Sequence, residues 1–155
     1  MTEVSGQIAS YTCNYTTPGI YTIRIGGVFP WFIVNGSGDK MKLLSVDQWG
    51  TNKWKNMRSA FAGAENMDVK ATDTPDLSQT TDLSWMFIGN KSLKGESANW
   101  NWNTSTITKM SGVFQNANQF NQNIGFWDVS KVTDTAAMFS GASAFNNGGS
   151  NSIAN

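Results

Sequence analysis

The chain of 155 residues contains no histidine and a single cysteine, Cys13. Without histidine, neither a Ser/His/Asp nor a Cys/His catalytic arrangement can be built, and metal sites based on histidine or cysteine ligands are also excluded. One cysteine cannot form a disulfide within the chain. The sequence therefore predicts a protein that is not an enzyme and that has no catalytic residues, no metal and no cofactor.

Charged residues are also scarce, at 14% of the chain, whereas soluble domains usually contain about 25%. The 11 basic residues balance the 11 acidic ones. No basic stripe is present to neutralise phosphates, so nucleic acid is not an expected partner. No apolar run approaches the length of a membrane span, and residues 1–5 lack the pattern of an export signal. We therefore expect no membrane span in this chain.

What the chain does contain is an internal repeat. Four segments align around a phenylalanine, with spacings of 26, 27 and 25 residues. An apolar residue lies one position before each phenylalanine and another lies six positions after it, and a tryptophan recurs upstream. The four phenylalanines are Phe61, Phe87, Phe114 and Phe139, and the upstream positions are Trp49, Pro75, Trp102 and Trp127.

Around each phenylalanine the pattern is typical of a short helix. Met110, Val113, Phe114 and Ala117 have the spacing of one helical face, which predicts that they belong to the core. A helix of about two turns needs its neighbours for stability. The expected N-caps are Thr81, Thr108 and Thr133, and the expected left-handed residues at the helix ends are Gly63, Gly89, Asn116 and Gly141.

Between these segments the apolar period changes to two, which predicts a short strand in each repeat. In the strand expected in residues 124–130, this period predicts that Trp127 and Val129 point inward. One strand and one helix per repeat predict an α/β solenoid, in which short parallel strands and short helices stack as in leucine-rich repeats. We expect about four such repeats in residues 41–155, the last one truncated.

Residues 1–40 lack the repeat and predict an N-terminal β-hairpin cap. Alternating apolar residues, among them Tyr11, Cys13 and Tyr15, flank the turn at residues 18–19, and Trp31 is expected to pack in this cap. The stretch 17–23 also resembles the closing hairpin of PKD-type immunoglobulin-like modules, an alternative that we do not favour.

The other end of the chain, residues 153–155, stops one position before the next expected tryptophan. This predicts that the parent protein continues with further repeats. An open end of the stack would expose apolar residues and unpaired strand edges, and would favour end-to-end self-association.

Two neighbouring segments of the sequence resemble the repeat of a known family. They are Ile107-Thr108-Lys109-Met110-Ser111-Gly112-Val113-Phe114-Gln115-Asn116-Ala117 and Phe120-Asn121-Gln122-Asn123-Ile124-Gly125-Phe126-Trp127-Asp128-Val129-Ser130. Together they resemble the repeat of BspA-like leucine-rich-repeat surface proteins of bacteria. Residues 131–146 are similar, with Thr135 in place of the usual methionine, and residues 46–105 match more loosely. The resemblance implies a secreted or cell-surface protein and adhesion to host matrix or other cells.

If Trp127 points inward, its neighbours in the strand point out of the sheet. The equivalent outward positions of the other repeats add amide, hydroxyl and carboxylate groups, a mixture that suits recognition of a protein surface or a sugar. Trp100 lies in an insertion that breaks the register, so we place it with this contact face rather than in the core. The predicted ligand-binding residues are Thr74, Asp76, Trp100, Asn101, Asn103, Phe126 and Asp128.

These residues predict a binding module whose partner is a protein or glycan on another cell or on the matrix. Two alternatives stay open at this point. The outward face could be a solvated surface without a ligand, and the chain could be a structural spacer or self-associating module of a larger surface or virion assembly.

Other candidates have simpler structural explanations. Asp73, Asp76 and Asp82 carry oxygen ligands suited to calcium, but turn and capping roles explain them better. The amide-rich stretch 116–123 is expected to satisfy backbone groups between repeats. We expect Trp49, Trp54, Trp102 and Trp127 to lie inside the core and Trp85 to lie at the surface.

Overall fold

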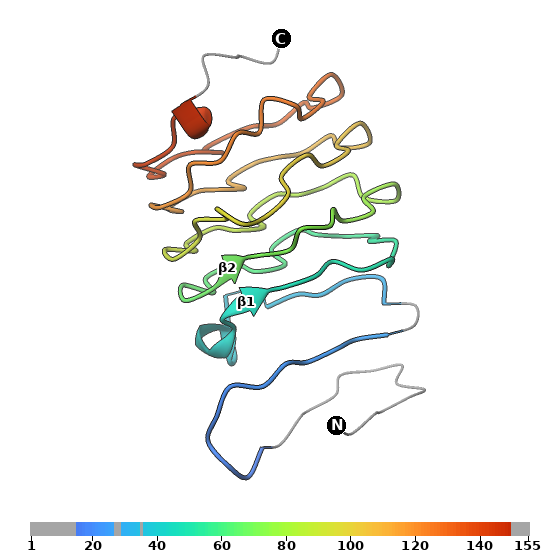
Figure 1. Ribbon diagram of the computed structural model, residues 1–155. Coiled ribbons are helices and arrows are strands. Elements are labelled where there is room, and N and C mark those ends of the chain that lie inside the picture. The colour runs from blue at the N-terminus through green and yellow to red at the C-terminus, as the bar shows by residue number, and fades with distance from the viewer. Residues whose placement is uncertain (1–14, 27–28, 35, 150–155) are drawn as a thin grey trace.

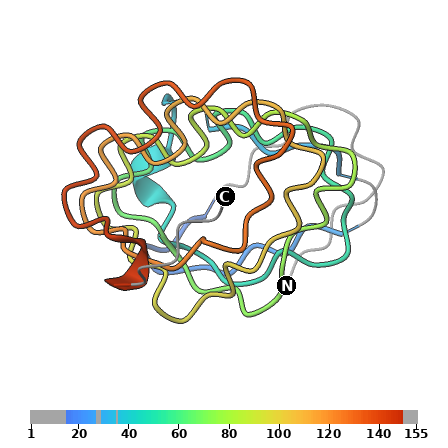
Figure 2. The ribbon, with the colours of Figure 1, turned by 90° about the horizontal axis from the view of Figure 1, so that it is seen from above.

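A computed structural model describes residues 15–26, 29–34 and 36–149. The chain winds in turns that lie one above another, and we call each turn a layer (Figure 1). Viewed along the stack, the layers superpose (Figure 2). Residues about 25 positions apart in the sequence are therefore neighbours in space, as the hydrogen bond from the amide of Phe61 to the carbonyl of Met86 at 3.0 Å illustrates.

Regular secondary structure is sparse. The elements are η1 (Lys40–Lys42), β1 (Ser45–Val46), β2 (Asp68–Val69) and η2 (Asn147–Gly149). Strands β1 and β2 are parallel and pair Val46 with Val69. Both η elements are single 3₁₀ turns. Within the described ranges there is no α-helix, and none of the helices is long and apolar enough to cross a membrane.

The segments around the phenylalanines form runs of tight turns in which the amides alternate between two kinds of partner. The amide of Ala62 donates to the carbonyl of Ser59, three residues earlier, at 3.2 Å, whereas the amide of Phe61 donates to the next layer. Left-handed residues lie two positions before and two positions after each phenylalanine. They are Ser59, Gly63, Trp85, Gly89, Gly112, Asn116, Ala137 and Gly141.

This backbone cannot be an α-helix, because a residue with positive φ lies on each side of every phenylalanine and half of the amides bond to another layer. The predicted N-caps have a different role as well. The hydroxyl of Thr108 donates to the carbonyl of Thr81 at 3.1 Å, and the hydroxyl of Thr133 donates to the carbonyl of Thr108 at 3.2 Å. The threonines thus link layers instead of capping helices.

The predicted fold class, an α/β solenoid resembling leucine-rich repeats, is therefore wrong. The described residues form a mostly loop, aromatic-rich fold with one pair of two-residue parallel strands. The predicted hairpin cap is wrong for its described part, since residues 15–26 form no strand and are exposed. Tyr11, Cys13 and residues 153–155 lie outside the described residues, and the boundary near residue 40 stays a prediction.

The prediction of the core residues is confirmed. Met110, Val113, Phe114 and Ala117 are fully buried. A column of stacked rings crosses the layers, with centroids 5.6 to 5.7 Å apart and interplanar angles of 8 to 12°. Its members are Phe61, Phe87, Phe114 and Phe139. The four tryptophans expected inside, Trp49, Trp54, Trp102 and Trp127, are buried.

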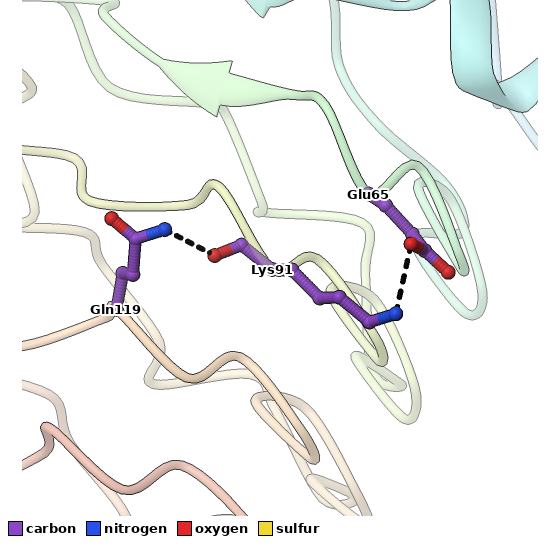
Figure 3. A network of polar contacts seen from close by, with 3 residues as sticks. All are labelled: Glu65, Lys91 and Gln119. Carbon is purple, nitrogen blue, oxygen red and sulfur yellow. Dashed lines mark hydrogen bonds and ion pairs between the residues drawn. The ribbon is translucent and has the colours of Figure 1, made fainter.

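Polar side chains satisfy backbone groups between layers, as predicted for the amide-rich stretch. Figure 3 shows the amide of the Gln119 side chain donating to the carbonyl of Lys91 at 2.9 Å. The ammonium of Lys91 pairs with the carboxylate of Glu65 in the preceding layer, at 2.9 Å. Gln122 donates in the same way to the carbonyl of Lys94. These contacts hold the layers in register where no strand pairs them.

Candidate binding surface

Four of the residues predicted to contact a ligand lie side by side and exposed. We call them the outward ladder: Asn101, Asn103, Phe126 and Asp128. They alternate along the chain with Trp102 and Trp127, whose buried rings stack with their centroids 5.5 Å apart. The hydroxyl of Thr104 donates to the carbonyl of Asp128 at 3.0 Å and joins the two layers. The predicted alternation of outward and inward side chains is thus confirmed here.

Phe126 is the most solvent-accessible large side chain of the outward ladder, with 72% of its surface exposed. The turn before it is fixed by two hydrogen bonds. The amide of Gly125 donates to the side-chain oxygen of Asn123 at 2.9 Å, and the amide of Trp127 donates to the carbonyl of Ile124 at 3.0 Å. The ring is therefore held at the surface by an ordered turn and contributes little to the core.

Val129 does not point inward as predicted, because 40% of its surface is exposed. The side-chain oxygen of Asp128 accepts a hydrogen bond from the amide of Ser130 at 2.9 Å. An aspartate bonded to the amide two residues later redirects the backbone. The alternation with period two therefore ends at Asp128.

Asp128 has two counterparts in the preceding layers, Asp76 and Asn103. Their side-chain oxygens accept the amides of Ser78 at 3.0 Å and of Ser105 at 3.2 Å. Hydrogen bonds from the hydroxyl and then the amide of the following serine lower the pKa of Asp76 and of Asp128. Both carboxylates are thus charged at neutral pH, and each has a structural role in its turn beside any role in binding.

Thr74 and Asp76 extend the outward ladder into the preceding layer, where they are half-buried. The two layers are joined by the hydroxyl of Thr106, which donates to the carbonyl of Leu77 at 3.0 Å. Pro75, which takes the place of the tryptophan of other layers, is buried between them. This end of the surface therefore offers less side-chain area to a partner than the outward ladder does.

Trp100 is not part of the surface, and its placement on the contact face is wrong. Only 5% of it is exposed. Its indole nitrogen donates to the carbonyl of Gly95 at 2.9 Å, and its ring stacks on Trp102 with a centroid distance of 5.1 Å. The sequence held a signal for this position, because Trp100 and Trp102 are two residues apart and the period of two places both on the inner side.

A second concave surface was not predicted from the sequence. It consists of two adjacent depressions of about 370 and 360 Å³ that share Asn56 and Arg58. Trp31, expected to be packed, is 54% exposed at its edge. Trp85 is half-buried, and the guanidinium of Arg58 lies over its ring. We call this surface the Arg58 groove; its lining residues are Trp31, Ile33, Lys55, Asn56, Arg58, Ser59, Thr81, Asp82 and Trp85.

The three aspartates considered for calcium all accept hydrogen bonds from backbone amides. The carboxylate of Asp73 accepts the amides of Trp49 at 3.0 Å and Gly50 at 2.8 Å, and that of Asp82 accepts the amide of Ser84 at 2.8 Å. In the part of the chain that the structure describes, no group of three acidic or cysteine side chains could hold a metal ion. The hydrogen bonds confirm the predicted turn role for Asp76 and Asp82, whereas Asp73 links two layers.

Residues 55–152 match the model of a protein family described as Mycoplasma protein of unknown function, DUF285. No curated protein and no solved structure matches the chain. The matching family is not the BspA-like leucine-rich-repeat family, so the resemblance drawn from the repeat phrases is wrong.

Proposed function

We propose that this chain, which belongs to the family described as Mycoplasma protein of unknown function, DUF285, is a non-enzymatic binding module. In this proposal it is secreted or displayed at the cell surface and attaches by contact to a protein of the matrix or of another cell. The observation that carries the proposal is the exposed ring of Phe126 among the polar side chains of the outward ladder. Exposed aromatic rings beside hydrogen-bonding groups are typical of the centres of protein interfaces.

The order of the outward ladder supports the same proposal. Its aromatic ring and its carboxylate, Phe126 and Asp128, are both held by turns with defined hydrogen bonds. Binding to a surface that is already ordered costs less conformational entropy than binding that must first order a loop. The amides of Asn101 and Asn103 can donate and accept hydrogen bonds. The surface therefore suits a partner with an apolar pocket surrounded by hydrogen-bond donors.

A binding experiment with a matched variant tests the proposal. The folded chain is measured against a panel of immobilised matrix proteins and glycans, together with Phe126→Ala and with Val129→Ala, which also shortens an exposed apolar side chain of the same layer. We expect saturable binding to a protein, weakened at least about tenfold by Phe126→Ala and unchanged by Val129→Ala. Binding to glycans alone, equal binding by Phe126→Ala, or no binding by the folded protein would contradict the proposal.

A second candidate function is a structural module that associates end to end. It is favoured by the last described layer, whose amides at Ala137, Phe139 and Gly141 have no hydrogen-bond acceptor among the described residues. In the layer before, the equivalent amide of Phe114 donates to the carbonyl of Met138 at 2.9 Å. An unpaired ladder of this kind is a template for another chain.

Sedimentation over a wide range of concentration separates the two candidates. A self-associating module would form larger species as concentration rises, and Ser140→Lys, which places a charge at an exposed position of this layer, would abolish them. A monomer at every concentration that still binds the panel supports the contact function, and association without binding supports the structural one.

A further inference from the structure

The Arg58 groove contains two cations that are not neutralised by the protein. The ion pairs of the described residues are Lys42 with Asp39 and Lys91 with Glu65. Neither Arg58 nor Lys55 takes part in them, and both are exposed. Asp82 is the only carboxylate of the lining and is engaged by the amide of Ser84. The groove therefore keeps a net positive charge in a chain whose total charge is zero.

Aromatic rings border this positive charge. The central carbon of the Arg58 guanidinium lies 4.6 Å from the centroid of the Trp85 ring. Stacking on an indole orients a guanidinium and leaves its N–H groups free to bind an anion. Trp31, at the other side of the groove, exposes more than half of its surface. A ligand in the groove would thus contact the Trp31 ring and a cation that Trp85 positions.

The lining comes from three successive layers that are bonded to one another. The amide of Lys55 donates to the carbonyl of Pro30 at 2.9 Å, and the amide of Ser59 donates to the carbonyl of Ser84 at 2.9 Å. The side-chain oxygen of Asn56 also accepts the amide of Arg58, at 2.9 Å. These bonds fix the backbone that carries the rings and cations, so the groove is formed before a ligand arrives.

We propose that the Arg58 groove binds an acidic saccharide, with a sugar ring against the exposed indole of Trp31 and its carboxylate or sulfate on Arg58 and Lys55. The apolar faces of sugar rings stack on indoles, and a guanidinium pairs with a carboxylate through two parallel hydrogen bonds. Asn56, Thr81 and Asp82 supply amide, hydroxyl and carboxylate groups for the sugar hydroxyls. An acidic peptide would match the cations but would leave the exposed ring of Trp31 without a flat apolar partner.

This site goes beyond the proposed function, because it shares no residue with the outward ladder and takes a ligand of another class. Failure of one is distinguishable from failure of the other. Phe126→Ala tests the outward ladder and leaves the groove intact, whereas Arg58→Gln tests the groove and leaves the outward ladder intact.

The test is a titration of the folded chain with a tetrasaccharide that contains glucuronic acid, with the same tetrasaccharide after reduction of its carboxylates, and with a sulfated tetrasaccharide. The variants are Arg58→Gln and Trp31→Ala, and the control is Lys70→Gln, which removes an exposed cation that does not line the groove. Circular dichroism checks that each variant is folded. The carboxylated and sulfated arms identify which anionic group the groove prefers.

We expect at least one acidic tetrasaccharide to bind about tenfold or more tightly than the reduced one, since a charge-assisted hydrogen bond contributes this much affinity. Arg58→Gln should remove that preference, Trp31→Ala should weaken binding of acidic and reduced forms alike, and Lys70→Gln should change neither. Equal affinity for acidic and reduced forms, binding unaffected by Arg58→Gln, or no binding by the wild type would overturn the proposal.

Discussion

At the scale of single residues, two aromatic side chains that the sequence places on the same surface have opposite roles. Trp100 is buried and bonded to Gly95, whereas Phe126 projects into solvent. Trp100 was assigned to the surface because the alignment of the repeats places it in an insertion. Its separation of two residues from the inward Trp102 predicts instead that both side chains lie on the inner side. A residue's neighbours in the strand predict its side better than its place in an alignment of repeats does.

Alanine substitutions separate these roles by stability. Trp100→Ala removes a large buried ring and should lower the free energy of unfolding by about 3–5 kcal/mol. Phe126→Ala removes an exposed ring and should change it by no more than about 0.5 kcal/mol. Urea denaturation followed by tryptophan fluorescence measures both. Similar losses for the two variants would contradict the assignment of Phe126 to the surface.

Two glycines test how tightly Trp100 is enclosed. Gly95 and Gly50 both have positive φ, of 66° and 71°, so alanine is strained at either position. A Cβ at Gly95 would lie 2.5 Å from the Trp100 ring, whereas one at Gly50 would meet nothing within 4 Å. Gly50→Ala should therefore cost about 1–2 kcal/mol, the strain alone, and Gly95→Ala clearly more. Equal melting temperatures for the two variants would show that the ring can move aside.

At the scale of elements, burial was predictable from the sequence and backbone conformation was not. The spacing of Met110, Val113, Phe114 and Ala117 does identify core residues. The same spacing suits a run of tight turns that presents apolar side chains to one side, so periodicity alone cannot distinguish it from a helix. The left-handed residues two positions before each phenylalanine were the missing signal, since only one of the four, Gly112, is a glycine.

The sign of a glycine substitution distinguishes turn from helix. In an α-helix Ala→Gly destabilises by about 1 kcal/mol. Ala137 has a φ of 54°, where glycine relieves strain, so Ala137→Gly should raise the melting temperature. Ala136→Gly, next to it and without a positive φ, is the control and should lower it. A lower melting temperature for Ala137→Gly would favour a helix.

The aspartate turns make stability depend on acidity. Hydrogen bonds from Ser130 lower the pKa of Asp128 from its ordinary value of 3.8 in the folded chain, so ionisation favours folding. This contribution is fully present above the unfolded-state pKa and is lost as the pH falls through the folded-state pKa. The melting temperature should thus begin to fall near pH 4. Asp128→Asn keeps an acceptor for Ser130, as Asn103 does for Ser105. The melting temperature of this variant should fall less steeply as the pH is lowered. Parallel curves for variant and wild type would contradict this.

At the scale of the whole molecule, the sequence identified the aromatic core and the outward ladder but not the fold class. Contacts between residues about 25 positions apart follow from the phenylalanine spacing, and the column from Phe61 to Phe139 bears this out. The Arg58 groove could not be predicted, because its lining comes from three layers. Neither Trp31 nor Arg58 belongs to a sequence motif that indicates a binding site. The lining of a groove between layers depends on which side chains lie next to one another in successive layers. Predicting these neighbours requires the correct backbone conformation.

The most direct test of the contact function is the affinity of two substitutions at one position. Phe126→Tyr keeps the exposed ring and Phe126→Ala removes it, and neither disturbs the turn at Gly125. Dissociation constants are measured for both, and for the wild type, against whichever panel protein binds the wild type. We expect near wild-type affinity for Phe126→Tyr and a loss of at least about tenfold for Phe126→Ala. Equal affinity of all three proteins would contradict the claim that the outward ladder is the binding surface.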